Sequence, residues 1–290
     1  MHTLTNQHGL TLGQCASLAC VLEATAPKPG NVHRGADFED LTYPDLILSG
    51  IAIAREIERA PERPLGQTIL AAVLATRRVV STNTNLGITL LLAPLAAAAT
   101  KPLPDGVRRV LDALSAEDAR LVYVAIRLAK PGGLGKVETA DVAGEPPESL
   151  VVAMRLAAER DLVARQYANG FAEVFGDVVP ALREAANRYP TLDAIVYAYL
   201  TVLAKHPDSL IARKCGPDTA HRASQQAAQI LASAKPGDAE WHERLADFDF
   251  WLRSDGHRRN PGTTADLITA GLFVTLWEGS VHLPFAKLDP

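Results

Sequence analysis

The sequence has few aromatic residues, little charge and no basic surplus. Aromatic side chains make up 6% of the 290 residues and charged side chains 21%, and the formal net charge is −4. Together with a calculated pI near 6.1, this balance argues against a surface that coats nucleic acid or an anionic membrane. Any anion that the protein binds must therefore be held by a local cluster of basic residues.

Cysteine is also scarce. The three cysteines, Cys15, Cys20 and Cys215, cannot all pair within the chain, and their spacing is not that of a metal or redox site. Residues 1–10 lack the basic start and the apolar run of a secretory signal. Both observations predict a protein of the reducing cytoplasm.

No apolar run in the sequence has the length of a membrane span. The longest one, residues 86–99, is too short to cross a bilayer and contains Pro94. It predicts a buried helix, and we expect no membrane partner.

Several catalytic motifs are missing as well. The eight histidines form no His-Glu-x-x-His or other zinc spacing, and the chain has neither a Gly-x-x-x-x-Gly-Lys-Ser/Thr phosphate loop nor a Gly-x-Ser-x-Gly elbow. Residues 131–136, Pro-Gly-Gly-Leu-Gly-Lys, lack the spacing and the preceding strand of a phosphate loop. We expect a mobile loop there, which at most closes over a site.

The sequence is rich in alanine, leucine and helical periodicity. Hydrophobic residues make up 48% of the chain, which is enough for a substantial core. Because the segments between turn signals are short and no flexible linker or repeat is visible, we predict an all-α fold, a single compact domain over residues 1–290 with roughly ten to twelve helices. Apolar residues recur at helical spacing in residues 12–24, 46–57, 69–80, 86–99, 119–128, 150–168, 178–186, 192–204, 219–234, 239–252 and 265–277.

Polar residues gather in four segments, the first of which is residues 26–40. Lys28 and Arg34 lie there close to carboxylates that include Asp37 and Asp40. Such mixed charge suits a phosphate and its Mg²⁺, with the cations on phosphate oxygens and the carboxylates on the metal. The alternative is a solvated surface loop followed by a helix that Thr42 caps.

The second segment, residues 81–87, places five short polar residues before the most apolar helix. Because one of them suffices as a cap, the excess suggests that Asn83 and Asn85 face a ligand at the positive end of that helix. Capping alone is the alternative.

The third segment, residues 213–222, carries basic residues at both ends. Arg213, Lys214 and Arg222 could meet phosphate, while Asp218 or Thr219 could cap a helix.

The fourth segment, residues 258–266, opens the last helix. Thr263 followed by Asp266 three residues later has the form of a capping box. Capping and ligand binding are both open for this segment.

Taken in order, these segments resemble the motifs of the triphosphoribosyl-dephospho-CoA synthase family. The family's early helix ends in a Glu before Thr-Pro-Lys-Pro-Gly, and its later motifs are Asn-Thr-His-Lys-Gly, Asp-Thr with Arg-Gly-Gly, and Ser-Pro-Gly-Gly-Ser-Ala-Asp-Leu. The similar stretches here are Glu23 with residues 26–30 and then Asp37 and Asp40, residues 83–87, Asp218-Thr219 with Arg222, and residues 260–267.

The chain departs from these motifs at several positions. Asn85 and Leu86 stand where the family has His and Lys, Asp37 stands where a His would follow Gly-Ala, and Ala223-Ser224 replaces Gly-Gly. Losing a lysine beside a triphosphate removes a strong point charge. Two alternatives therefore stay open: a related ATP-dependent ribosyl-transferring enzyme in the synthesis of another cofactor, and an inactive scaffold that binds a nucleotide or a partner.

The resemblance implies cleavage of the N-glycosidic bond of ATP and transfer of the triphosphoribosyl group to the ribose 2′-hydroxyl of dephospho-CoA, with release of adenine. It implies ATP and dephospho-CoA or another small acceptor as partners, Mg²⁺ as a cofactor, no nucleic acid, and leaves room for a homodimer. The residues that we assign on this basis are Asp218, Asp266 and Glu23 for catalysis, Lys28, Asn31, Arg34, Asn83, Asn85, Lys214 and Arg222 for the nucleotide, and Asp37 and Asp40 for the metal.

Overall fold

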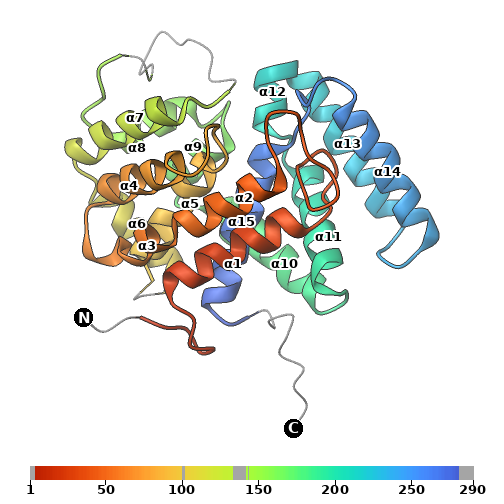
Figure 1. Cartoon of the computed structure of the whole chain (residues 1–290), viewed down its shortest axis with the longest axis horizontal. Coiled ribbons are helices and arrows are strands. Elements are labelled where there is room, and N and C mark those ends of the chain that lie inside the picture. Colours follow the sequence, from red (N-terminus) through yellow and green to blue (C-terminus); the bar gives the residue numbers. More distant parts are fainter. Residues whose placement is uncertain (1–3, 100–101, 133–141, 143, 281–290) are drawn as a thin grey trace.

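A computed structural model describes residues 4–99, 102–132, 142 and 144–280 (Figure 1). Over these residues the regular structure is helical, apart from two isolated β-bridges, which confirms the predicted all-α class. The α-helices are α1 Leu12–Thr25, α2 Tyr43–Ala52, α3 Ala54–Glu58, α4 Leu65–Arg77, α5 Leu86–Ala97, α6 Leu103–Asp112, α7 Ala116–Ala129, α8 Leu150–Ala157, α9 Leu162–Asn169, α10 Val179–Ala186, α11 Thr191–Lys205, α12 Ser209–Cys215, α13 Pro217–Ser233, α14 Ala239–Arg253 and α15 Gly262–Trp277. A 3₁₀ turn, η1 Ala60–Glu62, and a π-helix, η2 Val174–Val178, complete the set.

The helices in the described part of the chain number fifteen, more than the predicted ten to twelve. Two predicted ranges are each divided: residues 46–57 at Ile53, and residues 150–168 before Asp161, which caps a new helix through the N–H groups of residues 163 and 164. Two helices, α6 and α12, were not predicted. Pro102 and Pro104 signalled a turn, but proline is also accepted in the first turn of a helix, and α6 begins there.

The last helix, α15, lies at the centre of the fold. Nearly all of its residues are buried, and it contacts α1, α5, α9, α10, α11 and α12. In Figure 1, α4 to α9 gather on one side of α1 and α15, and α11 to α14 lie on the other. A helix buried on all faces reads as apolar all round rather than amphipathic, which the sequence of α15 shows.

The prediction of a buried helix at residues 86–99 is confirmed by α5, which is buried along most of its length. Pro94 cannot donate to the carbonyl four residues earlier, and the hydroxyl of Tyr167 donates to that carbonyl, Leu90 O, at 2.7 Å. Within the described residues, no helix combines the length and the apolarity that crossing a bilayer requires.

The capping predictions have mixed outcomes. Thr42 and Asp45 form the expected capping box at α2. The box predicted for Thr263 and Asp266 is wrong, because α15 begins after Pro261 without a side-chain cap. The cap predicted at Asp218 or Thr219 is also wrong, since α13 follows Gly216 without a side-chain cap.

Candidate active site

A cavity of about 1030 Å³ lies between the two groups of helices. Residues of α5, α8 and α9 line it from one group, residues of α12 from the other and residues of α15 from the central helix, together with loops at residues 31–41, 82–85 and 256–260. Pockets for one drug-sized ligand occupy roughly 300–1,000 Å³. The cavity therefore has room for a large ligand or for two that meet.

The residues assigned from the sequence divide into two sets. As far as the described residues define the cavity, seven line it: Glu23, Asn31, Asp40, Asn83, Asn85, Lys214 and Asp266. Five lie outside that lining: Lys28, Arg34, Asp37, Asp218 and Arg222.

Asp266 is the most perturbed acid of the cavity. It lies in the second turn of α15 and faces Gly87 in the first turn of α5. Burial raises its pKa well above the usual range, and the negative charges of Glu23, Asp208 and Asp161 raise it further, while Arg213 acts in the opposite direction. Burial and the neighbouring negative charges therefore favour the protonated form of Asp266, in which it can donate a proton.

Glu23, near the end of α1, is a second carboxylate of the cavity lining. Its Oε1 lies 2.9 Å from Lys28 Nζ, and Lys28 is fully buried. The same ammonium donates to the backbone carbonyls of Glu23 and Ala26. Because an ammonium has three N–H donors, Lys28 has none left for the phosphate contact expected from the sequence, and it holds Glu23 instead.

The other residues outside the lining have local roles. Asp37 Oδ1 accepts from Tyr43 N at 2.7 Å at the start of α2. Arg222 lies over the ring of Trp251, with 4.9 Å between its guanidinium carbon and the ring centre. Arg34 and Asp218 are exposed. The sequence shows that a loop carries charged side chains, but it does not show towards which part of the fold each one points.

The asparagines differ in what they offer a ligand. Asn85 accepts from the Thr76 hydroxyl at 3.1 Å and donates to Ser49 O at 3.3 Å, so both ends of its amide are engaged. Asn31 donates to Asn260 Oδ1 at 2.6 Å, but its own Oδ1 is buried and has no partner among the described residues. An orphaned buried amide oxygen in a cavity wall is suited to a ligand donor.

Five basic side chains are part of the cavity lining. Arg213 and Lys214 come from the end of α12, and Arg258 Nη2 donates to Lys214 O at 2.5 Å. Lys130 and Arg160 are also part of the lining. We call Lys130, Arg160, Arg213, Lys214 and Arg258 the basic cluster; it is the local concentration of positive charge that an anion requires in an acidic protein.

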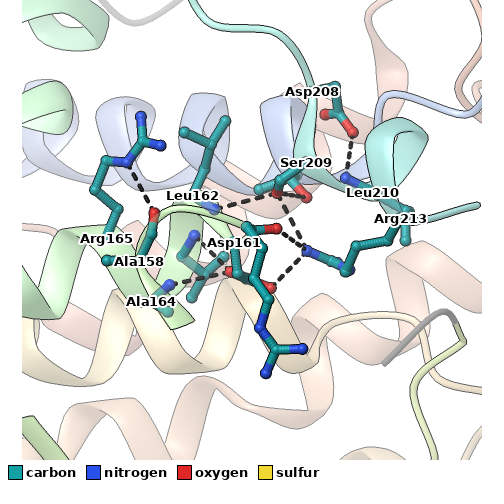
Figure 2. A network of polar contacts seen from close by, with 12 residues as sticks. Ala158, Asp161, Leu162, Ala164, Arg165, Asp208, Ser209, Leu210 and Arg213 are labelled. Carbon is teal, nitrogen blue, oxygen red and sulfur yellow. Dashed lines mark hydrogen bonds and ion pairs between the residues drawn. The ribbon is translucent and has the colours of Figure 1, made fainter. Parts of the chain in front are cut away.

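Arg213 is held in place by one edge of its guanidinium, as Figure 2 shows. Nη1 donates to Asp161 Oδ2 at 2.7 Å, to Arg160 O at 3.2 Å and to Ser209 Oγ at 3.3 Å. Nε is buried and lacks a hydrogen-bond partner in the described part of the structure. A guanidinium anchored on one side is pre-organised for bidentate contact with phosphate.

The starts of α9, α12 and α15 meet beside this arginine. The fully buried Asp208 caps α12 and accepts from Thr264 N at 2.7 Å and Thr264 Oγ1 at 2.8 Å. Ser209 Oγ accepts from Leu162 N at 3.1 Å (Figure 2). The side chains of Asp161 and Asp208 accept hydrogen bonds from the N–H groups at these helix starts, so the junction is held together by its caps.

The structure adds an aromatic edge that sequence reasoning missed. Phe38 and His257 line the cavity with their rings stacked 3.8 Å apart. His257 has a positive φ of 61°, and its Nδ1 is buried without a partner in the described residues. Nothing in the sequence signalled this contact, because the two residues are brought together only by the fold.

Asp161, Asp208 and Arg160 were also missed. A signal for Asp208 was present: the order of an aspartate, a hydroxyl residue and an arginine, assigned to Asp218, Thr219 and Arg222, occurs ten residues earlier in Asp208, Ser209 and Arg213. The earlier set lies at the cavity junction and the later set does not.

Among the described residues, no group of three or more His, Cys, Asp or Glu side chains is arranged to hold a metal ion. Of the two predicted metal ligands, Asp40 lines the cavity and Asp37 accepts a hydrogen bond from Tyr43 N at the start of α2. This set fits a Mg²⁺ that arrives on nucleotide phosphates and meets one carboxylate, and it does not fit a cage made of protein ligands alone.

Comparisons with known proteins show the family to which the chain is similar. The family model described as ATP:dephospho-CoA triphosphoribosyl transferase (CitG) matches residues 10–283. A crystal structure assigned as a triphosphoribosyl-dephospho-CoA synthase from Archaeoglobus fulgidus is 26% identical, covers 80% of this chain and 98% of its own, and superposes with a TM-score of 0.62. No curated protein is a significant match.

Proposed function

The chain belongs to the ATP:dephospho-CoA triphosphoribosyl transferase family, and from this premise we propose that it moves the triphosphoribosyl group of ATP to dephospho-CoA and releases adenine. The observation that carries the proposal is a single cavity whose lining combines Asp266, a carboxyl group with a raised pKa, and the basic cluster. A single domain over residues 1–290 would carry the whole reaction.

The reaction exchanges one bond for another at C1′ of the ATP ribose. The C1′–N9 bond to adenine breaks, and the 2′-hydroxyl oxygen of the acceptor bonds to C1′. The hydroxyl proton leaves and departing adenine gains a proton. Positive charge develops on the ribose in between, so the site needs an acid, a base and a fixed negative charge.

Asp266 and Glu23 take two of these tasks, the acid and the fixed negative charge, and the proton of the acceptor hydroxyl passes to solvent water. Burial and the neighbouring negative charges raise the pKa of Asp266 and favour its protonated form, which makes it the acid that protonates departing adenine. Glu23, ion-paired to Lys28, supplies the negative charge facing the ribose. Two carboxyl groups in different environments are a recurrent solution where one site must stabilise a cation and donate a proton.

The basic cluster takes the phosphates. In this proposal Arg213, Lys214 and Arg258 replace Lys28, Arg34 and Arg222 as the triphosphate contacts, because the cluster lines the cavity and the other three do not. Mg²⁺ would bind on the phosphates with Asp40 as its protein carboxylate. When bound, it neutralises part of the phosphate charge.

The assignment is tested by incubating the full chain with ATP, Mg²⁺ and dephospho-CoA and identifying the products by mass spectrometry. Free adenine together with dephospho-CoA enlarged by one triphosphoribosyl group supports the proposal. Release of adenine only with a different acceptor would favour the related ribosyl transferase, and nucleotide binding without turnover would favour the inactive scaffold.

A reducing compartment such as the cytoplasm suits the three cysteines, which are unpaired, with Cys15 and Cys20 buried. Burial raises the pKa of the Cys15 thiol to about 12, with a further contribution from the charge of Glu58, so it is inert as a nucleophile. A homodimer and the absence of nucleic-acid partners remain predictions from the sequence.

A further inference from the structure

The cavity has an apolar wall that the triphosphate and ribose of ATP do not need. Leu150, Ala153, Met154 and Ala157 of α8 line it. Their spacing of three and four residues places them on one face of the helix. Val163 and Ala164 in the first turn of α9 extend the same lining, and we call these six residues the apolar wall.

The wall leads directly to the basic cluster. Arg160 follows α8 by three residues and lines the cavity, and its backbone carbonyl accepts from Arg213 Nη1 at 3.2 Å. The backbone therefore fixes an apolar surface next to a phosphate-binding one. A ligand that spans both needs a long uncharged segment joined to a phosphate group.

Of the two substrates of the proposed reaction, only dephospho-CoA has that order of groups. Its pantetheine arm is an uncharged chain, and a diphosphate joins the arm to the adenosine that carries the acceptor hydroxyl. ATP offers only hydrated phosphates beyond its ribose. Removing apolar surface from water is favourable, at about 25 cal/mol per Å², so the wall distinguishes the acceptor from smaller nucleotides.

We propose that the apolar wall of α8 and α9 binds the pantetheine arm of dephospho-CoA, with the diphosphate of the acceptor at Arg160. The inference rests on the proposed function, and it specifies where the acceptor lies and what selects it. The remaining basic residues, Lys130, Arg213, Lys214 and Arg258, are then available to the triphosphate of ATP.

The test compares dephospho-CoA with ADP, which has the same adenosine and diphosphate but no pantetheine arm. Isothermal titration of the full chain measures the affinity of each. We expect wild type to bind dephospho-CoA about tenfold or more tightly than ADP, a factor that corresponds to about 1.4 kcal/mol. Equal affinities for the two would overturn the inference.

The variants Met154→Gln and Ala157→Gln place uncharged polar groups on the wall. We expect them to bring the affinity for dephospho-CoA down towards that for ADP and to leave the affinities for ADP and ATP within about twofold of wild type, since only the arm loses contacts. Val152→Gln is the matched control: Val152 lies on the same helix, is 50% exposed and is not part of the cavity lining. A variant that weakens ATP instead would show that the wall binds the donor.

Turnover separates this inference from the proposed function. If wild type discriminates dephospho-CoA from ADP but releases no adenine, the subsite stands and the proposed reaction fails. If adenine is released but Met154→Gln changes the affinities for dephospho-CoA and ADP equally, the reaction stands and the subsite fails. Thermal melting of each variant shows whether it is folded.

Discussion

The carboxyl group of Asp266 occupies the space that a side chain on Gly87 would need. A Cβ at position 87 would lie 2.6 Å from Asp266 Cγ and would overlap a carboxyl oxygen. The absence of a side chain in the first turn of α5 is thus what lets the acid of α15 lie at the cavity wall. The glycine of the motif at residues 83–87 therefore leaves room for the aspartate of the motif at residues 260–267.

Gly87→Ala should displace Asp266 and lower kcat strongly. A shift of about 1 Å in a catalytic group can cost about 10²-fold in rate, and overpacking of this kind typically costs about 1–3 kcal/mol of stability. Steady-state adenine release and thermal melting measure the two effects. Gly176→Ala is the control, because a Cβ at Gly176 meets nothing within 4 Å; a variant at Gly87 with wild-type kcat would contradict the role given to Asp266.

Asp266→Asn should abolish adenine release without unfolding the protein. Because the folded-state pKa of Asp266 lies above its unfolded value, the folded wild type binds the extra proton, and the stability from this group is lost as pH rises from about 4 through the folded pKa. The Asp266→Asn variant has no such proton to release, so its free energy of unfolding relative to wild type should rise over that pH range. Denaturant titrations at several pH values measure it, with the exposed Asp112→Asn as the control. Full activity in Asp266→Asn would rule out Asp266 as the acid.

The pH dependence of kcat should show the same group. A general acid works only while protonated, so kcat should fall as pH rises through the pKa of Asp266 in the complex. Glu23 is a negative charge that raises this pKa, and Glu23→Gln should therefore move the alkaline limb to lower pH, measured on its remaining activity. An alkaline limb that stays in place in Glu23→Gln would argue that another group titrates.

Arg213→Lys should raise KM for ATP by about 10- to 100-fold. A lysine keeps the charge but lacks the planar fork that contacts Asp161 and Ser209 with one edge and a phosphate bidentately with the other, and a charge-assisted hydrogen bond contributes about 1.5–3 kcal/mol. Initial rates at varied ATP provide the measurement. Arg244→Lys, in a surface pair with Glu240, should behave as wild type. An unchanged KM in Arg213→Lys would remove Arg213 from the phosphate site.

Lys28→Met should destabilise the protein by about 3–5 kcal/mol, because it leaves the carboxylate of Glu23 buried without its partner. Chemical denaturation measures the change. Adding Glu23→Gln should recover part of the loss, while Arg188→Met, which removes an exposed pair with Glu184, should have no measurable effect. A stable Lys28→Met protein with impaired ATP binding would instead support the phosphate role expected from the sequence.

The fold was predictable where local pattern decides it. Helical spacing and the scarcity of alternating β-branched residues gave the class, and the all-round apolar character of residues 86–99 indicated burial. The positions at which one helix ends and the next begins were harder to predict. Asp161 starts a new helix inside a continuous apolar pattern by capping the N–H groups of Val163 and Ala164, and only the backbone path reveals that choice.

The site was predictable in part for a similar reason. Asp266 and Glu23 were identified through motif resemblance, and both line the cavity. Lys28, in the same kind of motif, turns inward to Glu23 instead. A motif names the residue types that a site needs, but the direction of each side chain depends on packing between helices distant in sequence, as the joining of Asp208 to Thr264 illustrates.

The most direct test of the account counts free adenine against adduct in one reaction of the full chain with ATP, Mg²⁺ and dephospho-CoA. Wild type should release one adenine for each dephospho-CoA that gains a triphosphoribosyl group, and Asp266→Asn should form neither product. Equal yields from wild type and Asp266→Asn, or adduct formed without adenine, would contradict it.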